Sequence, residues 1–166
     1  RRYKLLPNNE YVCFTKDAIK SGGNPEVYLK DRILVRQIGK YPEGTICPSG
    51  IYTLNTIYNI YLLNTRISLK YLLGLINSKV LQYYWIEKFS DSKETFPKIK
   101  KKPLESLPIV EASYQMQQKL MTLIDIENEK NIDLLIYHLY NLTYDEVLIV
   151  DPETPITREE YENISN

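Results

Sequence analysis

The stretch of residues 68–110 most constrains the fold, because a helix pattern passes there into a basic run divided by prolines. Apolar side chains recur at spacings of three and four through residues 69–89, which predicts a helix with one face in a core. Ser68 is placed to cap its first turn. Gly74 and the Asn-Ser pair at 77–78 weaken the middle, since glycine costs about 1 kcal/mol against alanine and Asn and Ser compete for backbone hydrogen bonds. We therefore expect the helix to bend or begin again near residue 77.

The second half of this stretch has a different character. Pro97, Pro103 and Pro108 divide a segment that is rich in lysine. Proline lacks an amide hydrogen and pushes the residue before it into extended geometry. We therefore predict an extended, basic surface segment over residues 96–110.

Strand patterns precede the helix. Residues 31–38 alternate as a strand, the turn signal at 41–44 follows, and a short strand is predicted at 45–47. Residues 51–63 are rich in Ile, Tyr, Thr and Leu and predict one long or two short strands, and residues 11–15 predict a peripheral one. These segments indicate a small, mostly antiparallel sheet.

Helix patterns follow the basic segment. Apolar residues have helical spacing over 113–125 and again over 131–142. Residues 143–146 and 157–160 each read Thr-x-x-Glu, the pattern of a capping box, so a short helix is expected after each.

The predicted fold class is α+β: a small, mostly antiparallel sheet packed with a central helix and followed by C-terminal helices. We divide the chain into a linker and peripheral hairpin over residues 1–30, a core over 31–112, and an acidic helical tail over 113–166 that packs on or next to the core.

Charge is distributed unevenly, although the whole chain is neutral. Residues 1–110 hold 18 Lys and Arg against 9 Asp and Glu, whereas residues 111–166 hold 3 against 12. A basic front suggests a polyanionic partner, and the acidic end is either a solvated appendage or a surface that docks on a basic partner.

The two cysteines, Cys13 and Cys47, have no metal-like spacing and form no disulfide framework, so we expect a reducing, cytoplasmic environment. No signal peptide and no membrane-spanning apolar run is evident. The chain begins at Arg1, and we expect it to be a segment of a longer protein.

Four motifs follow one another through the central stretch: LGLINSK at 73–79, YYW at 83–85, FPKIK at 96–100 and LESLPI at 104–109. In this order and spacing they resemble the TaqI-like C-terminal specificity domain. The resemblance extends from about residue 33 to about residue 150, and it includes a match of residues 131–143 to the helix that often follows these domains.

The resemblance implies a DNA target recognition domain without catalysis of its own. The parent would be an adenine-specific DNA methyltransferase of a bacterial or archaeal restriction-modification system, with or without a fused endonuclease. The implied partners are double-stranded DNA and the methyltransferase domain of the same polypeptide, with no membrane. We expect no cofactor in this chain, and S-adenosylmethionine and Mg²⁺ only in other parts of the parent.

The residues themselves agree that catalysis is absent. An adenine methyltransferase needs an Asn-Pro-Pro-aromatic loop and a Gly-rich loop, and the one Asn-Pro of the chain is followed by Glu26. No carboxylate cluster has the spacing of a nuclease metal site, so no metal ligands are proposed. His138 lies in a helix pattern among apolar residues and is interpreted as a packing or surface histidine.

Recognition is therefore assigned to basic and amide side chains. Lysines orient a protein on DNA through phosphates, whereas Arg, Asn and Gln read base edges through paired donors and acceptors. The candidates for DNA-backbone contact are Lys88, Lys93, Lys98, Lys100, Lys101 and Lys102. The candidates for base reading are Arg36, Gln37, Thr53, Asn55 and Asn59. Residues 77–78 are interpreted as structural, with side chains that satisfy backbone groups at the helix break.

One alternative comes from another class of protein. The helical tail could make the chain a protein-interaction or oligomerisation module, with Leu135, Ile136, Leu139 and Tyr140 at the interface rather than in the core.

Overall fold

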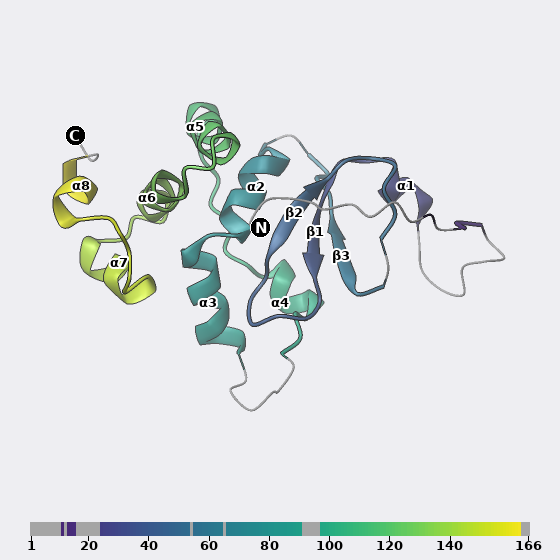
Figure 1. Ribbon diagram of the computed structural model, residues 1–166, viewed down its shortest axis with the longest axis horizontal. Coiled ribbons are helices and arrows are strands. Elements are labelled where there is room, and N and C mark those ends of the chain that lie inside the picture. The colour runs from purple at the N-terminus through teal and green to yellow at the C-terminus, as the bar shows by residue number, and fades with distance from the viewer. Residues whose placement is uncertain are drawn as a thin grey trace.

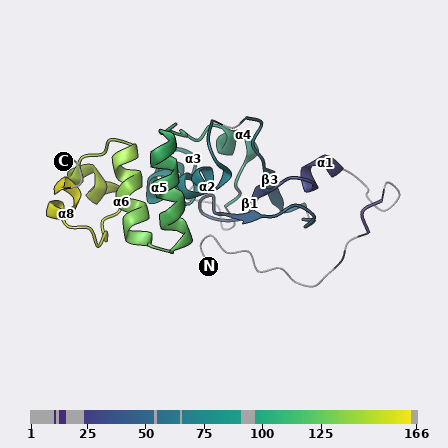
Figure 2. The ribbon, with the colours of Figure 1, turned by 90° about the horizontal axis from the view of Figure 1, so that it is seen from above.

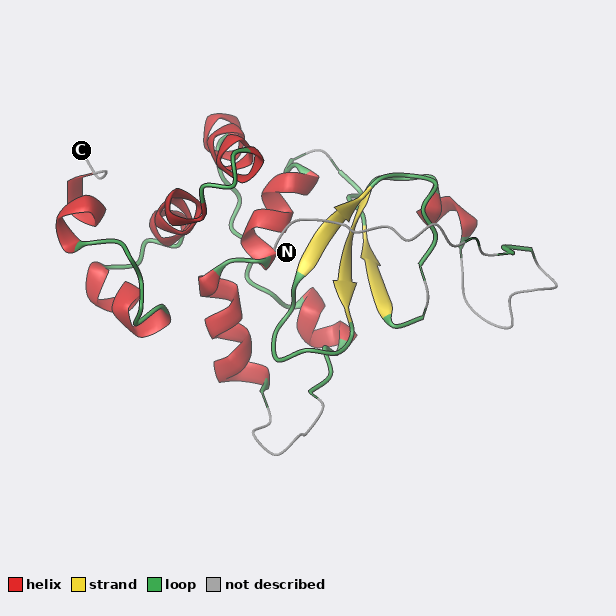
Figure 3. Cartoon of the chain, viewed as in Figure 1, coloured by secondary structure: helices red, strands yellow, loops and turns green. Residues whose placement is uncertain are grey.

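A computed structural model describes residues 11, 13–15, 24–53, 55–64, 66–90 and 97–163. The molecule is elongated: the sheet lies at one end, the central helices in the middle, and the C-terminal helices at the other end (Figures 1 and 2). The described strands all precede the central helices in the chain. Figure 3 shows the strands in yellow gathered into one sheet, with the helices in red. The predicted α+β class is confirmed.

The sheet has three strands in the order β2-β1-β3, and both pairings are antiparallel. β1 spans Arg32–Arg36, β2 spans Gly44–Cys47 and β3 spans Ile57–Ile60. Ile33 and Val35 are fully buried in the core cluster that includes the helices. Strand alternation therefore places one face of β1 against the helices, as the pattern predicts.

The central helix is two helices, as the weak residues at its middle predict. α2 spans Leu69–Ile76 and α3 spans Lys79–Phe89. The Ser68 hydroxyl accepts from the Tyr71 amide at 3.0 Å and begins α2. At the break, the Ser78 hydroxyl donates to the Leu75 carbonyl at 2.7 Å and accepts from the Leu81 amide at 3.2 Å.

Asn77 has the other structural role at the break. Its side-chain Oδ1 accepts from the Gly44 amide at 2.8 Å, and its Nδ2 donates to the Gly44 carbonyl at 2.9 Å. Residue 44 begins β2, so the helix break is attached to the sheet by a pair of hydrogen bonds. The structural interpretation of residues 77–78 is confirmed.

The prediction of an extended segment throughout 96–110 is wrong in one part. Residues 97–100 lack helical structure, but a short helix, α4, spans Lys101–Glu105. Pro103 is its third residue. The first-turn amides of a helix have no intrahelical acceptor, so proline loses nothing at that position.

Three other predictions need correction. Among the described residues of 51–63, only Ile57–Ile60 form a strand, β3, and residues 51–53 are irregular. A short helix, α1, spans Pro25–Tyr28 where only a turn was predicted, with the Asn24 side chain as its cap. Of the strand predicted at 11–15, the described residues 11 and 13–15 are in no strand.

The tail is helical, as predicted. α5 spans Tyr114–Asp125, α6 spans Glu129–Leu139, α7 spans Tyr144–Val150 and α8 spans Arg158–Asn163. Both predicted capping boxes are present: the side chains of Thr143 and Glu146 cap each other's backbone at α7, and those of Thr157 and Glu160 do so at α8.

The tail packs on the central helices through α5. Gln117 is nearly fully buried there, and its amide donates to the carbonyls of Arg66 at 2.9 Å and Ala112 at 3.0 Å. Its Oε1 accepts from the Ser68 amide at 2.9 Å. Because all these groups are satisfied, the buried amide fixes α5 at the start of α2. Within the described ranges, no helix has the length and apolar character to cross a membrane.

Candidate nucleic-acid interface

The basic segment is attached to the end of β1 by backbone hydrogen bonds. The Ile99 amide donates to the Gln37 carbonyl at 2.9 Å, and the Gly39 amide donates to the Pro97 carbonyl at 3.0 Å. The Tyr58 hydroxyl of β3 donates to the Ile99 carbonyl at 3.1 Å. The structure thus joins residue 37, a predicted base reader, to the segment that carries the predicted phosphate contacts.

This attachment determines the direction of the lysines. Ile99 is 2% exposed and belongs to the core, while Lys98 and Lys100 on either side of it are exposed. In extended backbone, neighbouring side chains point to opposite sides. The two lysines therefore point to solvent because the isoleucine between them points inward.

The other lysines of the predicted set differ in their surroundings. Lys101 and Lys102 are exposed on α4, and Lys101 forms an ion pair with Glu105 at 3.6 Å. Lys88 at the end of α3 donates to the Tyr84 hydroxyl at 2.6 Å and lies over the Phe89 ring. Lys93 lies outside the described residues.

Arg36 ends β1 and lies close to Gln37. Its guanidinium is half exposed and forms an ion pair with Glu43 across the β1–β2 turn. Such exposed pairs contribute only about 0–1 kcal/mol, so the guanidinium is available to a stronger acceptor at small cost. Gln37 is half-buried, with its backbone amide on the Thr56 carbonyl at 2.9 Å.

Thr53 and Asn59 are part of an internal network. Arg32 is fully buried, and its Nε donates to Asn59 Oδ1 at 2.7 Å. The Asn59 Nδ2 in turn donates to the Thr53 hydroxyl at 3.1 Å. The guanidinium also reaches the carbonyls of Pro48 at 3.4 Å and of Ile51.

This network changes the interpretation of two base-reading candidates. The amide of Asn59 is already engaged, and a buried guanidinium without it would lose a hydrogen bond. Base reading by these two residues stays a prediction, and their observed contact joins the irregular residues 51–53 to the sheet. Asn55 is exposed in the turn before β3 and has a free approach to solvent.

Arg32 and Lys40 are not among the site residues predicted from the sequence. Alternation placed Arg32 on the face away from the helices, where a polar strand residue is expected to be exposed. Its burial follows from contacts with a loop distant in sequence, which no local pattern reveals. Lys40 is exposed in the β1–β2 turn, and only the fold brings it to the basic segment.

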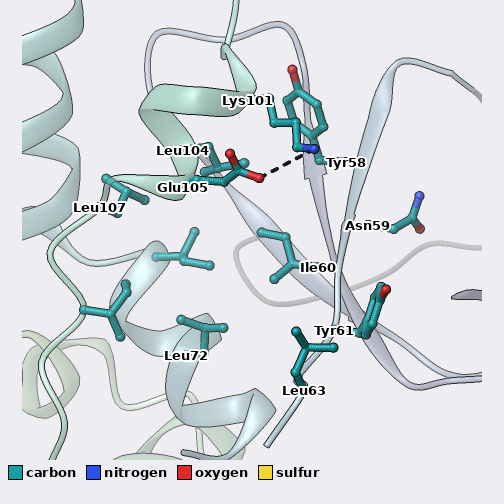
Figure 4. A pocket seen from close by; sticks show the side chains of 12 residues that line it. Tyr58, Asn59, Ile60, Tyr61, Leu63, Leu72, Lys101, Leu104, Glu105 and Leu107 are labelled. Atoms are coloured by element: carbon teal, nitrogen blue, oxygen red, sulfur yellow. Dashed lines mark ion pairs between the residues drawn. The ribbon is translucent and has the colours of Figure 1, made fainter.

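An apolar groove lies on the other side of α4. It has a volume of about 330 Å³ and is enclosed by β3, α2 and α4 (Figure 4). Leu63, Leu72, Leu104 and Leu107 are among its walls, with the Lys101–Glu105 ion pair at one side. An apolar lining suits hydrocarbon side chains, so we do not assign the groove to phosphate contact.

The described residues hold no group of three or more His, Cys, Asp and Glu side chains that could bind a metal ion. His138 stacks on Tyr161 of α8 with ring centroids 4.2 Å apart, and burial lowers its pKa. This histidine therefore has the packing role that was predicted. Cys47 is buried, and burial raises the pKa of its thiol, which disfavours the reactive thiolate.

The fold and the site together define a class of protein in which a small sheet packs against helices and carries an exposed basic segment. Comparison with protein families gives the particular family. The model of the TaqI-like C-terminal specificity domain matches residues 1–109, and the chain belongs to this family of DNA-recognition domains of restriction-modification enzymes. The match ends with the LESLPI motif, so it covers the predicted resemblance from residue 33 to residue 109 and leaves out the part from residue 110 to about 150. No curated protein matches the chain.

Proposed function

We propose that this chain recognises the target sequence of a restriction-modification adenine methyltransferase, or of a fused methyltransferase-endonuclease, and binds duplex DNA without catalysis of its own. The observation that carries the proposal is the attachment of the basic segment to the end of β1. One backbone hydrogen bond joins Ile99, which lies between two exposed lysines, to the potential base reader Gln37, and a second joins Gly39 to Pro97. Phosphate contacts orient a protein on DNA and base contacts supply specificity, so the two kinds of group must be adjacent.

The proposed division of roles follows from the surroundings of each side chain. Lys98, Lys100 and Lys102 are exposed and are assigned to phosphates, and Lys101 joins them when its ion pair opens. Arg36 and Gln37 are assigned to bases, because a guanidinium and an amide present paired groups to guanine and adenine.

The proposed partner on the protein side is the methyltransferase domain of the same polypeptide, in the cytoplasm of a bacterium or archaeon. S-adenosylmethionine and Mg²⁺ would be bound by other parts of that parent. The acidic helical tail would keep DNA on the basic side, since Asp and Glu repel phosphates.

The test is selection of duplexes from a random-sequence library by the whole chain, at low and at moderate salt. Enrichment of one motif at moderate salt is the expected result. Gln37→Ala should then change the enriched motif, whereas Lys100→Glu with Lys101→Glu should weaken binding to all sequences alike. A library that shows no enrichment at either salt concentration would refute sequence recognition by this chain.

The interaction-module alternative has less support from the tail. Leu135 and Ile136 are buried in the core cluster, and Leu139 and Tyr140 pack against it. A second chain could not reach Leu135 and Ile136 without opening the fold, whereas Leu139 and Tyr140 are half-buried. Light scattering of the whole chain distinguishes the two functions, because a stable monomer argues against oligomerisation.

A further inference from the structure

A small hollow lies where the β1–β2 turn, the end of α3 and the basic segment meet; Figure 1 shows the turn beside α3 and α4. Three lysines from two parts of the chain line it: Lys40 from the turn, and Lys98 and Lys100 from the basic segment. Trp85 and Phe89 of α3 contribute aromatic walls, with their ring centroids 5.1 Å apart.

Within the described residues, these three lysines have no carboxylate partner. No carboxylate in the described part of the chain forms an ion pair with Lys40, Lys98 or Lys100, whereas Lys101 pairs with Glu105. Three ammonium groups around one hollow repel each other, and an anion between them would remove that repulsion. The arrangement therefore favours an anionic ligand.

The size of the hollow limits what enters it. Its volume is about 30 Å³. A cavity needs a volume of roughly 10–15 Å³ to hold one water molecule. The hollow therefore admits the oxygens of one phosphate and is too small for a base. Trp85, one of the two aromatic residues that line the hollow, is only 3% exposed. A base therefore cannot stack on the Trp85 ring.

We propose that Lys40, Lys98 and Lys100 together bind a single backbone phosphate of the DNA duplex. This inference rests on the proposed function and makes it more specific. It adds a residue from the β1–β2 turn, and it assigns three positive charges to one phosphate rather than to three. The single phosphate would fix the register of Arg36 and Gln37 at the end of β1 on the duplex.

The salt dependence of binding tests the number of phosphates. The logarithm of the binding constant falls with the logarithm of salt concentration by about 0.9 for each phosphate contacted. We expect each single substitution, Lys40→Ala, Lys98→Ala or Lys100→Ala, to weaken binding of a 30-base-pair random duplex roughly two- to fivefold with little change in slope. The triple variant should lose about 0.9 from the slope, the contribution of one phosphate.

A matched control removes the same charge elsewhere. Lys30, Arg66 and Lys119 are exposed and lie on segments outside the hollow. The triple variant Lys30→Ala, Arg66→Ala and Lys119→Ala should keep the wild-type slope. Circular dichroism of each variant confirms that the fold is intact.

The outcomes separate this inference from the proposed function. A loss of about 0.9 from each single variant, adding up in the triple variant, would mean three separate phosphates and would overturn the shared site. An unchanged slope in the triple variant would overturn it as well, while wild-type binding would leave the proposed function standing. A wild-type chain that binds no duplex would overturn both.

Discussion

Asn77→Ala removes the pair of hydrogen bonds between the helix break and the sheet. In the structure both ends of the Asn77 amide bind the backbone of Gly44, at 2.8 Å and 2.9 Å. Ile33 and Val35 of β1 lie in the core cluster, and residue 44 is the register partner of Val35 in the sheet. The substitution leaves both backbone groups of residue 44 without their partner.

The expected cost can be estimated from those two groups. A backbone donor or acceptor that loses its partner in a buried position costs about 1–3 kcal/mol. Gly44 is half-buried, so water replaces part of the loss, and we expect about 2–4 kcal/mol for the two groups together. For a chain of this size that corresponds to a fall in Tm of roughly 5–15 °C.

Urea unfolding followed by circular dichroism measures the change in the free energy of unfolding. Two further variants are compared with Asn77→Ala. Asn55→Ala removes an exposed asparagine of the turn before β3 and should change stability by less than about 0.5 kcal/mol. Asn77→Asp keeps the acceptor for the Gly44 amide but sets a carboxylate against its carbonyl, so it should cost as much as alanine. A loss below about 0.5 kcal/mol for Asn77→Ala would show that these two hydrogen bonds do not stabilise the fold as proposed.

Three further predictions concern titratable groups. The Lys130 amine and the Thr157 amide hold the pKa of Glu160 down at about 2. Stability should therefore fall as the pH drops from 4.5 towards 2. Glu160→Gln should remove this acid dependence, whereas the control Glu159→Gln should leave it unchanged. Burial raises the pKa of Tyr71 from 10 to about 12, so stability should fall as the pH rises through this window, and Tyr71→Phe should flatten that part of the unfolding curve. Glu43→Gln frees Arg36 from its ion pair and removes a negative charge, so it should strengthen duplex binding roughly two- to fivefold in a filter-binding assay at low salt.

Much of the fold follows from local patterns. The capping boxes at residues 143–146 and 157–160 and the break at 77–78 are short-range features, and the structure contains each of them. α4 was missed because the prolines were interpreted only as helix breakers. Pro103 falls in a first turn, where proline is compatible with a helix.

The candidate site was harder to predict, because its geometry depends on contacts distant in sequence. Gln37 meets Ile99 through a backbone hydrogen bond across about sixty residues, and no pattern in either segment predicts that pairing. Arg32 is buried because the carbonyls of Pro48 and Ile51 and the amide of Asn59 surround its guanidinium. Two of these partners lie in the irregular segment after β2 and the third lies in β3, and no local pattern in the sequence brings them together around Arg32.

The same hydrogen bonds to backbone groups hold both the candidate site and the core. Asn77 binds the first residue of β2, and the turn that leads into this strand carries Lys40. Tyr58 binds the carbonyl of Ile99, so the basic segment is fixed to β3 as well as to β1. Side chains on such a scaffold lose less conformational entropy on binding than side chains on a free loop.

The residues that hold the fold together differ from the residues that we assign to base reading. The scaffold contacts are made by backbone groups, by the buried side chain of Asn77 and by the half-buried side chain of Tyr58. Arg36 and Gln37 contribute only backbone and one surface ion pair to the fold. Substitutions at 36 and 37 should therefore alter the recognised bases at a cost below about 1 kcal/mol in stability.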